Sequence, residues 1–202
     1  MARPGRCFVP GCALHVVNRG NDRRIIFPEA VDYGSFLALL REGRERFPVQ
    51  IYAYDLVKNH FHLVLAAEHL GALSAYMHFV QRSHACDLRA IAQTRGQGHV
   101  FQRRYWSAVL EGSGRLLNAL RYVEANALRA SLVDKAEDWE WGSLWERVTG
   151  ERDLLSQLPF HLPDGWPAIV NTPQHALDLK LVRTALRPGR PAGPVDLRNP
   201  KK

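Results

Sequence analysis

The sequence predicts an α+β protein with an antiparallel four-stranded sheet of the ferredoxin-like type, a split β-α-β arrangement with helices on one face. Two observations predict this fold, and a third concerns the end of the chain. Strand-like and helix-like apolar patterns follow one another in the order strand, helix, strand, strand, helix, strand, helix. Only two residues separate the second and third strands, as in a hairpin. The chain then ends in a basic extended C-terminal tail rich in proline and glycine.

A polar turn separates the first predicted strand from the first helix. Residues 13–17 are apolar, and the Gly-Asn-Asp sequence shortly after them favours turn geometry. Residues 29–47 repeat apolar side chains at helical spacing. Pro48 ends this helix, because proline disfavours helical geometry in the residue before it.

The hairpin comes next. Residues 49–57 are rich in β-branched and aromatic residues, which are typical of a strand. Lys58 and Asn59 form a tight turn, and residues 60–66 then return as the third strand. The two strands are therefore expected to pair with each other.

The remaining core elements are a long helix, a short strand and a third helix. Residues 72–93 have helical spacing and are followed by two glycines that can end a helix. Residues 105–110 are short and apolar, as in a fourth strand. Residues 115–131 carry one apolar stripe, and Ser113 can cap that helix.

Composition changes after Val133, which predicts three parts. Residues 1–135 are expected to form the core domain, and residues 136–180 a C-terminal extension rich in tryptophan and proline. Residues 181–202 are expected to form a basic, flexible tail, since the last twenty residues carry six basic side chains and one acidic one. A last short helix is expected over residues 177–186.

Charge and composition restrict the class of protein. A formal net charge of +7 and a pI near 9.7 favour a polyanionic partner. The chain contains no run of 18 apolar residues, so we expect no membrane span and a cytoplasmic location. Cys7, Cys12 and Cys86 cannot build a disulfide framework, and they lack zinc-finger spacing.

The sharpest local pattern is the His-Phe-His sequence at the start of the third strand. Side chains alternate faces along a strand, so His60 and His62 share one face while Phe61 points to the other. Two adjacent imidazoles can chelate a divalent cation, zinc included. Two histidines on a solvated strand face would give the same pattern without any function.

A second pattern lies on the third helix. Tyr122 and Asn126 are four residues apart and therefore one above the other, away from the apolar stripe. Arg115 and Arg129 share that flank. A tyrosine at the margin between helix and sheet, with its hydroxyl in water, is the structural alternative.

A third pattern mixes basic and aromatic residues in positions 101–106. Arg103 and Arg104 suit phosphate contacts, and Tyr105 or Trp106 suits stacking on exposed bases. An arginine-bearing turn that leads into an edge strand explains the same residues equally well.

Together these segments resemble the tyrosine transposases, enzymes of the HUH type. The segments that carry the resemblance are HVVNRGN (15–21), AYDLVKNHFHL (53–63), VFQRRY (100–105), RYVEANALRA (121–130) and WEWGS (139–143). The tail sequence LRPGRP (186–191) is similar to the basic end of REP-associated tyrosine transposases. Lys58 and Ala127 stand where that family usually has proline, and neither change removes a reacting group.

The resemblance implies a metal-dependent enzyme that nicks and rejoins single-stranded DNA at a hairpin through a 5′-phosphotyrosine. Residues 1–135 would be its catalytic domain, with Tyr122 as nucleophile and Mg²⁺ or Mn²⁺ held by His60, His62 and Asn126. DNA would contact Arg19, Asn21, Arg23, Arg103, Arg104, Tyr105, Arg187 and Arg190. Relatives act as homodimers or as monomers, so either state is compatible with the sequence.

Two other functions remain open on the sequence alone. Ferredoxin-like sheets also serve as nucleic-acid platforms, so a non-catalytic DNA- or RNA-binding regulator is possible. A zinc hydrolase built on His60 and His62 would need a third protein ligand and a bound water.

Overall fold

Residues 8–91 and 98–174, with the single positions 179, 182 and 184, are described by a computed structural model of the chain. The strands are β1 (Ala13–Arg19), β2 (Val49–Val57), β3 (His60–Ala67) and β4 (Trp106–Leu110). The helices are α1 (Ala30–Arg46), α2 (Leu70–Ile91), α3 (Gly112–Glu124), α4 (Asn126–Arg129), α5 (Ser143–Thr149) and α6 (Trp166–Asn171), with two 3-10 turns, η1 (Asn21–Arg23) and η2 (Ala136–Asp138). Within these ranges no helix is both long and apolar enough to cross a membrane. Most of the helix predicted over 177–186, and nearly all of the tail predicted over 181–202, lie outside the described residues.

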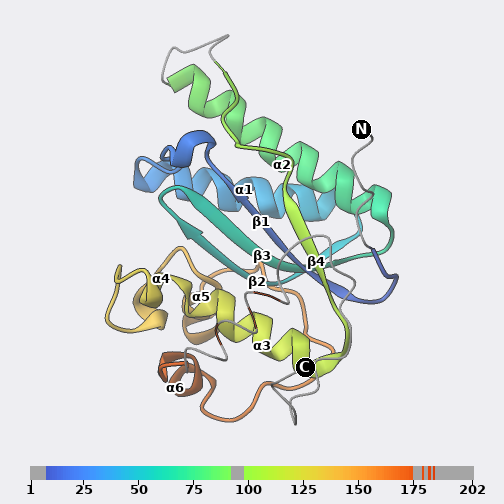
Figure 1. The fold of residues 1–202 in the computed structure, drawn as a ribbon, viewed down its shortest axis with the longest axis vertical. Coiled ribbons are helices and arrows are strands. Elements are labelled where there is room, and N and C mark those ends of the chain that lie inside the picture. Colours follow the sequence, from blue (N-terminus) through green and yellow to red (C-terminus); the bar gives the residue numbers. More distant parts are fainter. Residues whose placement is uncertain (1–7, 92–97, 175–178, 180–181, 183, 185–202) are drawn as a thin grey trace.

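The four strands form one antiparallel sheet in the order β2-β3-β1-β4 (Figure 1). β2 and β3 pair as the predicted hairpin, with Val57 opposite His60 across the two-residue turn. β1 lies between β3 and β4 and is antiparallel to both. The α+β class and the four-stranded antiparallel sheet are therefore confirmed.

The prediction that the helices cover one face was wrong for α3. Figure 1 shows α1 and α2 on one side of the sheet and α3 and α5 on the other. Leu14 of β1 faces the α1–α2 side, whereas its neighbour Ala13 packs with residues of α3. The reason is topological. α1 and α2 each connect strands of the sheet, and connections of one hand lie on the same face. α3 follows the last strand, so it is free to cover the opposite face.

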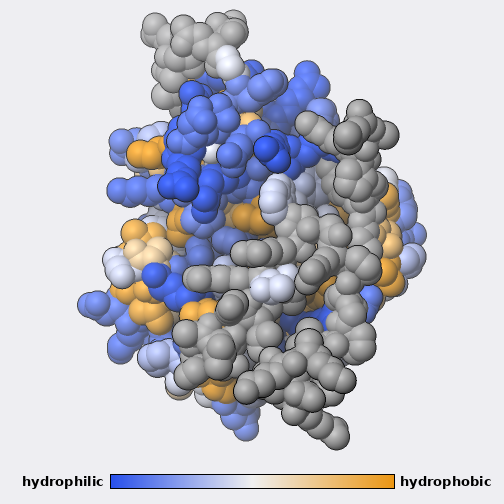
Figure 2. Space-filling model, viewed as in Figure 1, coloured by the Kyte–Doolittle hydropathy of each residue, from blue (hydrophilic) through white to orange (hydrophobic). Residues whose placement is uncertain are grey.

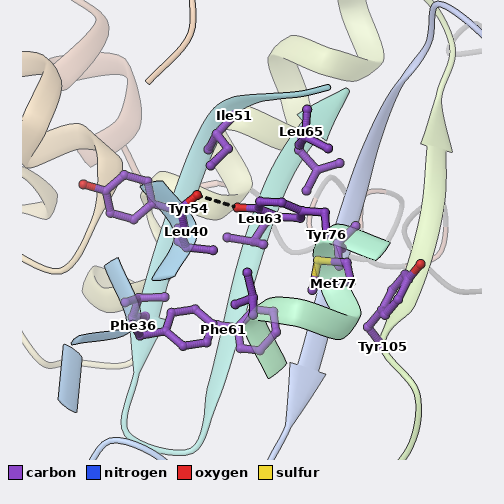
Figure 3. Close-up of a cluster of buried hydrophobic side chains, with 14 of the residues drawn as sticks. Phe36, Leu40, Ile51, Tyr54, Phe61, Leu63, Leu65, Tyr76, Met77 and Tyr105 are labelled. Atoms are coloured by element: carbon purple, nitrogen blue, oxygen red, sulfur yellow. Dashed lines mark hydrogen bonds between the residues drawn. The ribbon is translucent and has the colours of Figure 1, made fainter. Parts of the chain in front are cut away.

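The core between the sheet and α1–α2 is rich in aromatic side chains (Figure 3). Phe36 of α1 packs on Phe61 of β3, with ring centroids 5.0 Å apart. Tyr76 of α2 is fully buried, and its hydroxyl donates a hydrogen bond to the Leu40 carbonyl at 3.2 Å. This core fixes the back of β3, so the histidines on its other face are presented by a rigid strand.

The described part of the C-terminal extension is fastened to α3 through a buried carboxylate. Glu124, the last residue of α3, accepts hydrogen bonds from Ser143 Oγ at 2.8 Å, Arg147 Nε at 2.7 Å and Trp166 Nε1 at 2.6 Å. Its side chain is completely enclosed. The extension therefore holds the end of the helix that carries Tyr122. The predicted divisions at residues 135 and 180 stay predictions.

Candidate active site

His60 and His62 open β3 and lie on the face covered by α3. Their ring centroids are 5.1 Å apart, while Phe61 between them is buried in the opposite core. The alternation predicted from the sequence is thus present in the structure. His62 is buried and His60 is partly exposed, so the pair lies at the margin of the face rather than on an open, solvated strand.

His15 of β1 is a third member of this group, and sequence reasoning did not select it as a site residue. Its Nε2 lies 2.9 Å from Nδ1 of His62, and the two rings stack with centroids 5.1 Å apart. The antiparallel register explains the contact, because Val17 is opposite His62 and His15 is the next residue on the same face. His15 is buried.

Hydrogen bonds determine which ring nitrogens remain available for a ligand. His60 Nδ1 lies 2.7 Å from Oδ1 of Asn59, an atom that can only accept, so Nδ1 carries the proton and Nε2 keeps its lone pair. His62 reaches the same state when its Nδ1 donates to His15 Nε2. In that tautomer both neighbouring histidines offer Nε2 to a metal ion, and His15 is the group that orients His62.

Burial keeps all three imidazoles neutral. It lowers the pKa of His15 to about 4. Burial, together with the positive charge of Arg19, lowers the pKa of His60 to about 4. The pKa of His62 is well below its usual value, because of burial and then the charges of neighbouring groups. Metal ligation needs neutral imidazole, so the environment favours the ligating form.

Tyr122 extends from α3 over these histidines. Its ring is edge-on to His62 and to His15, with centroid distances of 6.0 and 6.2 Å. The guanidinium of Arg129 lies 4.2 Å from the centre of the tyrosine ring, and its Nη2 donates to the Tyr122 carbonyl at 2.7 Å. Tyr122 is half-buried, so its position is set by specific contacts and differs from that of a fully solvated marginal tyrosine.

The helix that was predicted over 115–131 is interrupted beside the tyrosine. α3 ends at Glu124, Ala125 has φ −84° and ψ 6°, and α4 begins at Asn126. The carbonyl of Tyr122 is engaged by the Arg129 side chain at this break. Tyr122 and Asn126 therefore lie on two successive helical segments, where the sequence had predicted one continuous helix.

Asn126 is oriented by Asp55, a residue that sequence reasoning missed. The Nδ2 group of Asn126 donates to Oδ2 of Asp55 at 2.7 Å, which turns the amide oxygen away from Asp55. Asp55 lies on β2 directly opposite His62 and is completely buried. Its Oδ1 is buried without a hydrogen-bond partner in the described structure. Burial raises the pKa of Asp55 to about 8, although Asn126 and Arg129 oppose that shift.

The donor set fits a divalent cation that combines nitrogen and oxygen ligands. His60 and His62 would supply two imidazoles, and Asn126 would supply an amide oxygen, which here accepts from Arg129 Nη2 at 3.4 Å. Among the described residues, no group of three or more His, Cys, Asp or Glu side chains is arranged to hold a metal ion. A zinc hydrolase would need such a third ligand, so the described residues do not support that alternative.

The residues predicted to contact DNA occupy different places. Arg19 lies opposite His60 at the end of β1, close to the histidines. Asn21 and Arg23 form the adjacent turn, in which Arg23 is exposed. Arg103 and Arg104 are also exposed. Tyr105, which was also predicted to contact DNA, is a core residue. Arg187 and Arg190 lie outside the described residues.

Tyr105 immediately precedes β4 and is only 7% exposed. The aromatic residue that β4 presents to solvent is Trp106, which is 44% exposed. The alternation of β4 explains the difference. Trp106 is opposite Val17 and therefore lies on the face of His15 and His62, whereas Tyr105 points into the core beside α2.

The buried histidines predict how stability depends on pH. They stay neutral in the folded protein but bind protons near pH 6.5 when unfolded, so the free energy of unfolding should fall as the pH drops from about 6.5 to about 4. We expect a loss on the order of 3 kcal/mol from each of His15 and His60 in the metal-free protein, measurable by urea denaturation at a series of pH values.

Asp55 acts in the opposite direction. The ordinary pKa of this carboxyl is 3.8, and burial raises it to about 8. Between these two pH values Asp55 is ionised only in the unfolded chain, so the free energy of unfolding falls as the pH rises towards 8. Stability should therefore be greatest near neutral pH. In Asp55→Asn the decline from pH 6.5 to 8 should be smaller while the acid loss remains. An unchanged decline in that variant would contradict the assignment.

The chain is similar to known proteins in both sequence and fold. The family model described as "Transposase IS200 like" matches residues 8–126. Among solved structures, a REP-associated tyrosine transposase bound to a REP hairpin is 13% identical, with a TM-score of 0.60 over 81% of this chain and 96% of that chain. A crystal structure described as "a putative transposase from deinococcus radiodurans r1" is 16% identical, with a TM-score of 0.41 over 65% of this chain and 92% of that chain. No curated protein matches the sequence.

Proposed function

The chain belongs to the family of IS200-like transposases, and on this premise we propose that it cuts and rejoins single-stranded DNA with Tyr122 as the nucleophile. One observation carries the proposal: the ring of Tyr122 lies beside His62 and His15, on the sheet face that also holds His60. A tyrosine placed only for packing would not need two buried, neutral histidines as its neighbours.

The proposed reaction forms one bond and breaks one bond. The phenol oxygen of Tyr122 loses its proton and attacks phosphorus, and the P–O3′ bond breaks to release a free 3′-hydroxyl. The DNA is left attached to Tyr122 as a 5′-phosphotyrosine ester. Because this ester keeps the bond energy of the phosphodiester, attack by a 3′-hydroxyl can reverse the step and join strands without ATP.

Each neighbouring side chain has a defined task in this proposal. His60, His62 and Asn126 would hold Mg²⁺ or Mn²⁺, which supplies charge stabilisation to the phosphate during the transfer. Asp55 and His15 orient two of these ligands through hydrogen bonds. Arg129 holds the tyrosine ring and places a positive charge beside it, where an anionic phosphate must approach.

The proposed substrate is a DNA hairpin with an unpaired flank. The REP-associated transposase of similar fold is bound to a REP hairpin, and this chain carries the half-buried Arg19 and the exposed Arg23 next to its own site. Arg19 and Arg23 would contact phosphates near the histidines, and Arg103 and Arg104 would contact the strand farther away. Binding of this kind weakens steeply with salt.

The direct test uses labelled hairpin DNA from beside the gene, incubated with Mn²⁺, Mg²⁺ or EDTA. Wild type should produce a nick and a protein–DNA adduct that survives a denaturing gel, and only when metal is present. Tyr122→Phe should bind the same DNA but yield neither product. If wild type binds tightly yet never cleaves with either metal, the non-catalytic regulator becomes the better description.

Mixing variants shows whether one chain holds a whole site. Tyr122 and His62 approach each other within a single chain, so a mixture of Tyr122→Phe and His62→Ala proteins should stay inactive, below roughly 1% of wild type. Substantial recovery of cleavage in the mixture would mean that the tyrosine helix acts on a partner's histidines.

Loss of His15 should weaken the site without removing a ligand. Replacing it by alanine removes the acceptor for His62 Nδ1–H, and we expect Mn²⁺ affinity to fall roughly 10- to 100-fold. Isothermal titration calorimetry with Mn²⁺ measures this affinity directly. His15→Gln retains a side-chain acceptor and should lose less. Equal Mn²⁺ affinity in wild type and His15→Ala would rule out an orienting role.

A further inference from the structure

A groove of about 610 Å³ lies on the other side of the sheet, between α2 and the segment that leads into β4. In Figure 1 this segment runs alongside α2, and Figure 2 shows hydrophilic side chains gathered over both elements. Arginines from both walls line the groove: Arg82 and Arg89 from α2, and Arg103 and Arg104 from the facing segment. None of the described lining residues is acidic, so the groove suits a polyanion.

The two walls are held at a fixed separation by one buried residue. Asn18 of β1 donates through Nδ2 to Gln81 Oε1 on α2 at 2.8 Å and to the Arg103 carbonyl at 3.1 Å. Asn18 is buried. The groove is therefore a preformed feature of the fold, because both of its walls are hydrogen-bonded to the same strand residue.

Gln81 provides a recessed donor inside this groove. Its oxygen is engaged by Asn18, which fixes the amide, and its Nε2 is buried without a hydrogen-bond partner in the described structure. A buried N–H group without an acceptor costs free energy, so this position calls for a ligand atom that accepts a hydrogen bond. The carbonyl and ring-nitrogen edges of nucleobases are such acceptors.

The recessed position of the Gln81 donor in the groove favours unpaired over paired DNA. The Nε2 atom of Gln81 is buried in the wall of the groove, which Phe101 and Met77 also line. A base edge reaches such a recessed donor only when it is turned out of a duplex, whereas duplex phosphates would meet only the outer arginines. A volume near 610 Å³ also falls within the range of about 300–1,000 Å³ typical of small-ligand sites.

We propose that this groove binds unpaired nucleotides of the DNA strand whose cleavage is proposed at Tyr122. The site and the groove lie back to back, since Asn18 faces the groove and its neighbour Val17 is opposite His62. β4 is the edge strand between them. The strand passes from the groove around this edge and over Trp106, whose ring is exposed on the catalytic face.

The test measures binding of the full chain in EDTA, so that cleavage plays no part. Fluorescence anisotropy compares a labelled hairpin that has an oligothymidine flank with the same hairpin made blunt. Arg82→Glu should weaken binding of the flanked hairpin roughly tenfold or more, and should lower its salt dependence by about one ion. Arg41→Glu makes the same charge change at an exposed position on α1 and is the matched control.

Gln81→Met tests the recessed donor without a change of charge. Methionine is close to glutamine in size, but it has no N–H to offer a base. We expect roughly fivefold weaker binding of the flanked hairpin and little change for the blunt one. If both groove variants bind like Arg41→Glu, or lose affinity equally for both hairpins, the proposal is overturned.

This proposal rests on the proposed function only for the identity of its ligand. A wild-type protein that discriminates flanked from blunt DNA through Arg82 and Gln81, but forms no adduct with metal, would retain the groove and lose the catalytic claim. If instead the adduct forms normally and both groove variants bind DNA like wild type, the catalytic claim is retained and the groove proposal is lost.

Discussion

The His62→Ala variant is expected to cleave hairpin DNA roughly 100- to 1,000-fold more slowly than wild type at saturating Mn²⁺. His62 occupies the middle of the site, with His60, His15 and Tyr122 around its ring. Its removal takes away one proposed ligand and leaves His15 without its partner. A metal ion contributes several kcal/mol to the stabilisation of charge in such transfers, which sets this magnitude.

Two controls separate this effect from damage to the fold. His161→Ala changes an exposed histidine in the C-terminal extension and should cleave normally. His62→Gln keeps a polar side chain that can still bond to His15, so it should fold like wild type yet remain slow. Thermal unfolding of each variant should accompany the rates. A folded His62→Ala protein with wild-type cleavage would show that His62 is no ligand.

The Glu124→Ala variant should lose about 3–5 kcal/mol of unfolding free energy. The carboxylate is fully enclosed and is the common acceptor for Ser143, Arg147 and Trp166. Its removal leaves the guanidinium of Arg147 largely buried without its counter-charge and releases the extension from α3. Urea denaturation followed by tryptophan fluorescence measures the loss, because Trp166 is itself part of the network.

Glu111→Ala is the matched control for that measurement. Glu111 immediately precedes the first residue of α3, its side chain is exposed, and its carboxylate lies 3.8 Å from Arg115 in a long ion pair, so its loss should cost no more than about 0.5–1 kcal/mol. Glu124→Gln keeps an oxygen acceptor but loses the charge, and should fall between the two. Equal stability of the Glu111→Ala and Glu124→Ala proteins would refute the anchoring role of Glu124.

Local patterns predicted much of the fold, because strands, helices and the hairpin turn depend on neighbouring residues. The same hairpin could also have revealed Asp55. With Lys58 and Asn59 as a two-residue turn, Val57 is opposite His60, and counting back places Asp55 opposite His62. An acidic residue in an otherwise apolar strand, facing a candidate ligand, was the available signal.

Other features depend on contacts between distant segments, and no local pattern contains them. β1 and β3 are joined through a helix and another strand, so the register that brings His15 to His62 is set by the sheet as a whole. The helix break at Ala125 likewise depends on where Asn126 meets Asp55. α3 was predicted to follow the last strand, but the face that it covers is set by its packing against the sheet, which no local pattern contains.

The most direct test of the central claim is peptide mapping of the protein–DNA adduct. Trypsin cleaves after Arg121 and Arg129, and the peptide between them, YVEANALR, contains Tyr122 as its single hydroxyl-bearing residue. Mass spectrometry of the metal-dependent adduct, after nuclease digestion, should find a nucleotide phosphate on this peptide and on no other. Attachment to a different peptide, or an adduct that persists in Tyr122→Phe, would contradict the assignment of Tyr122 as the nucleophile.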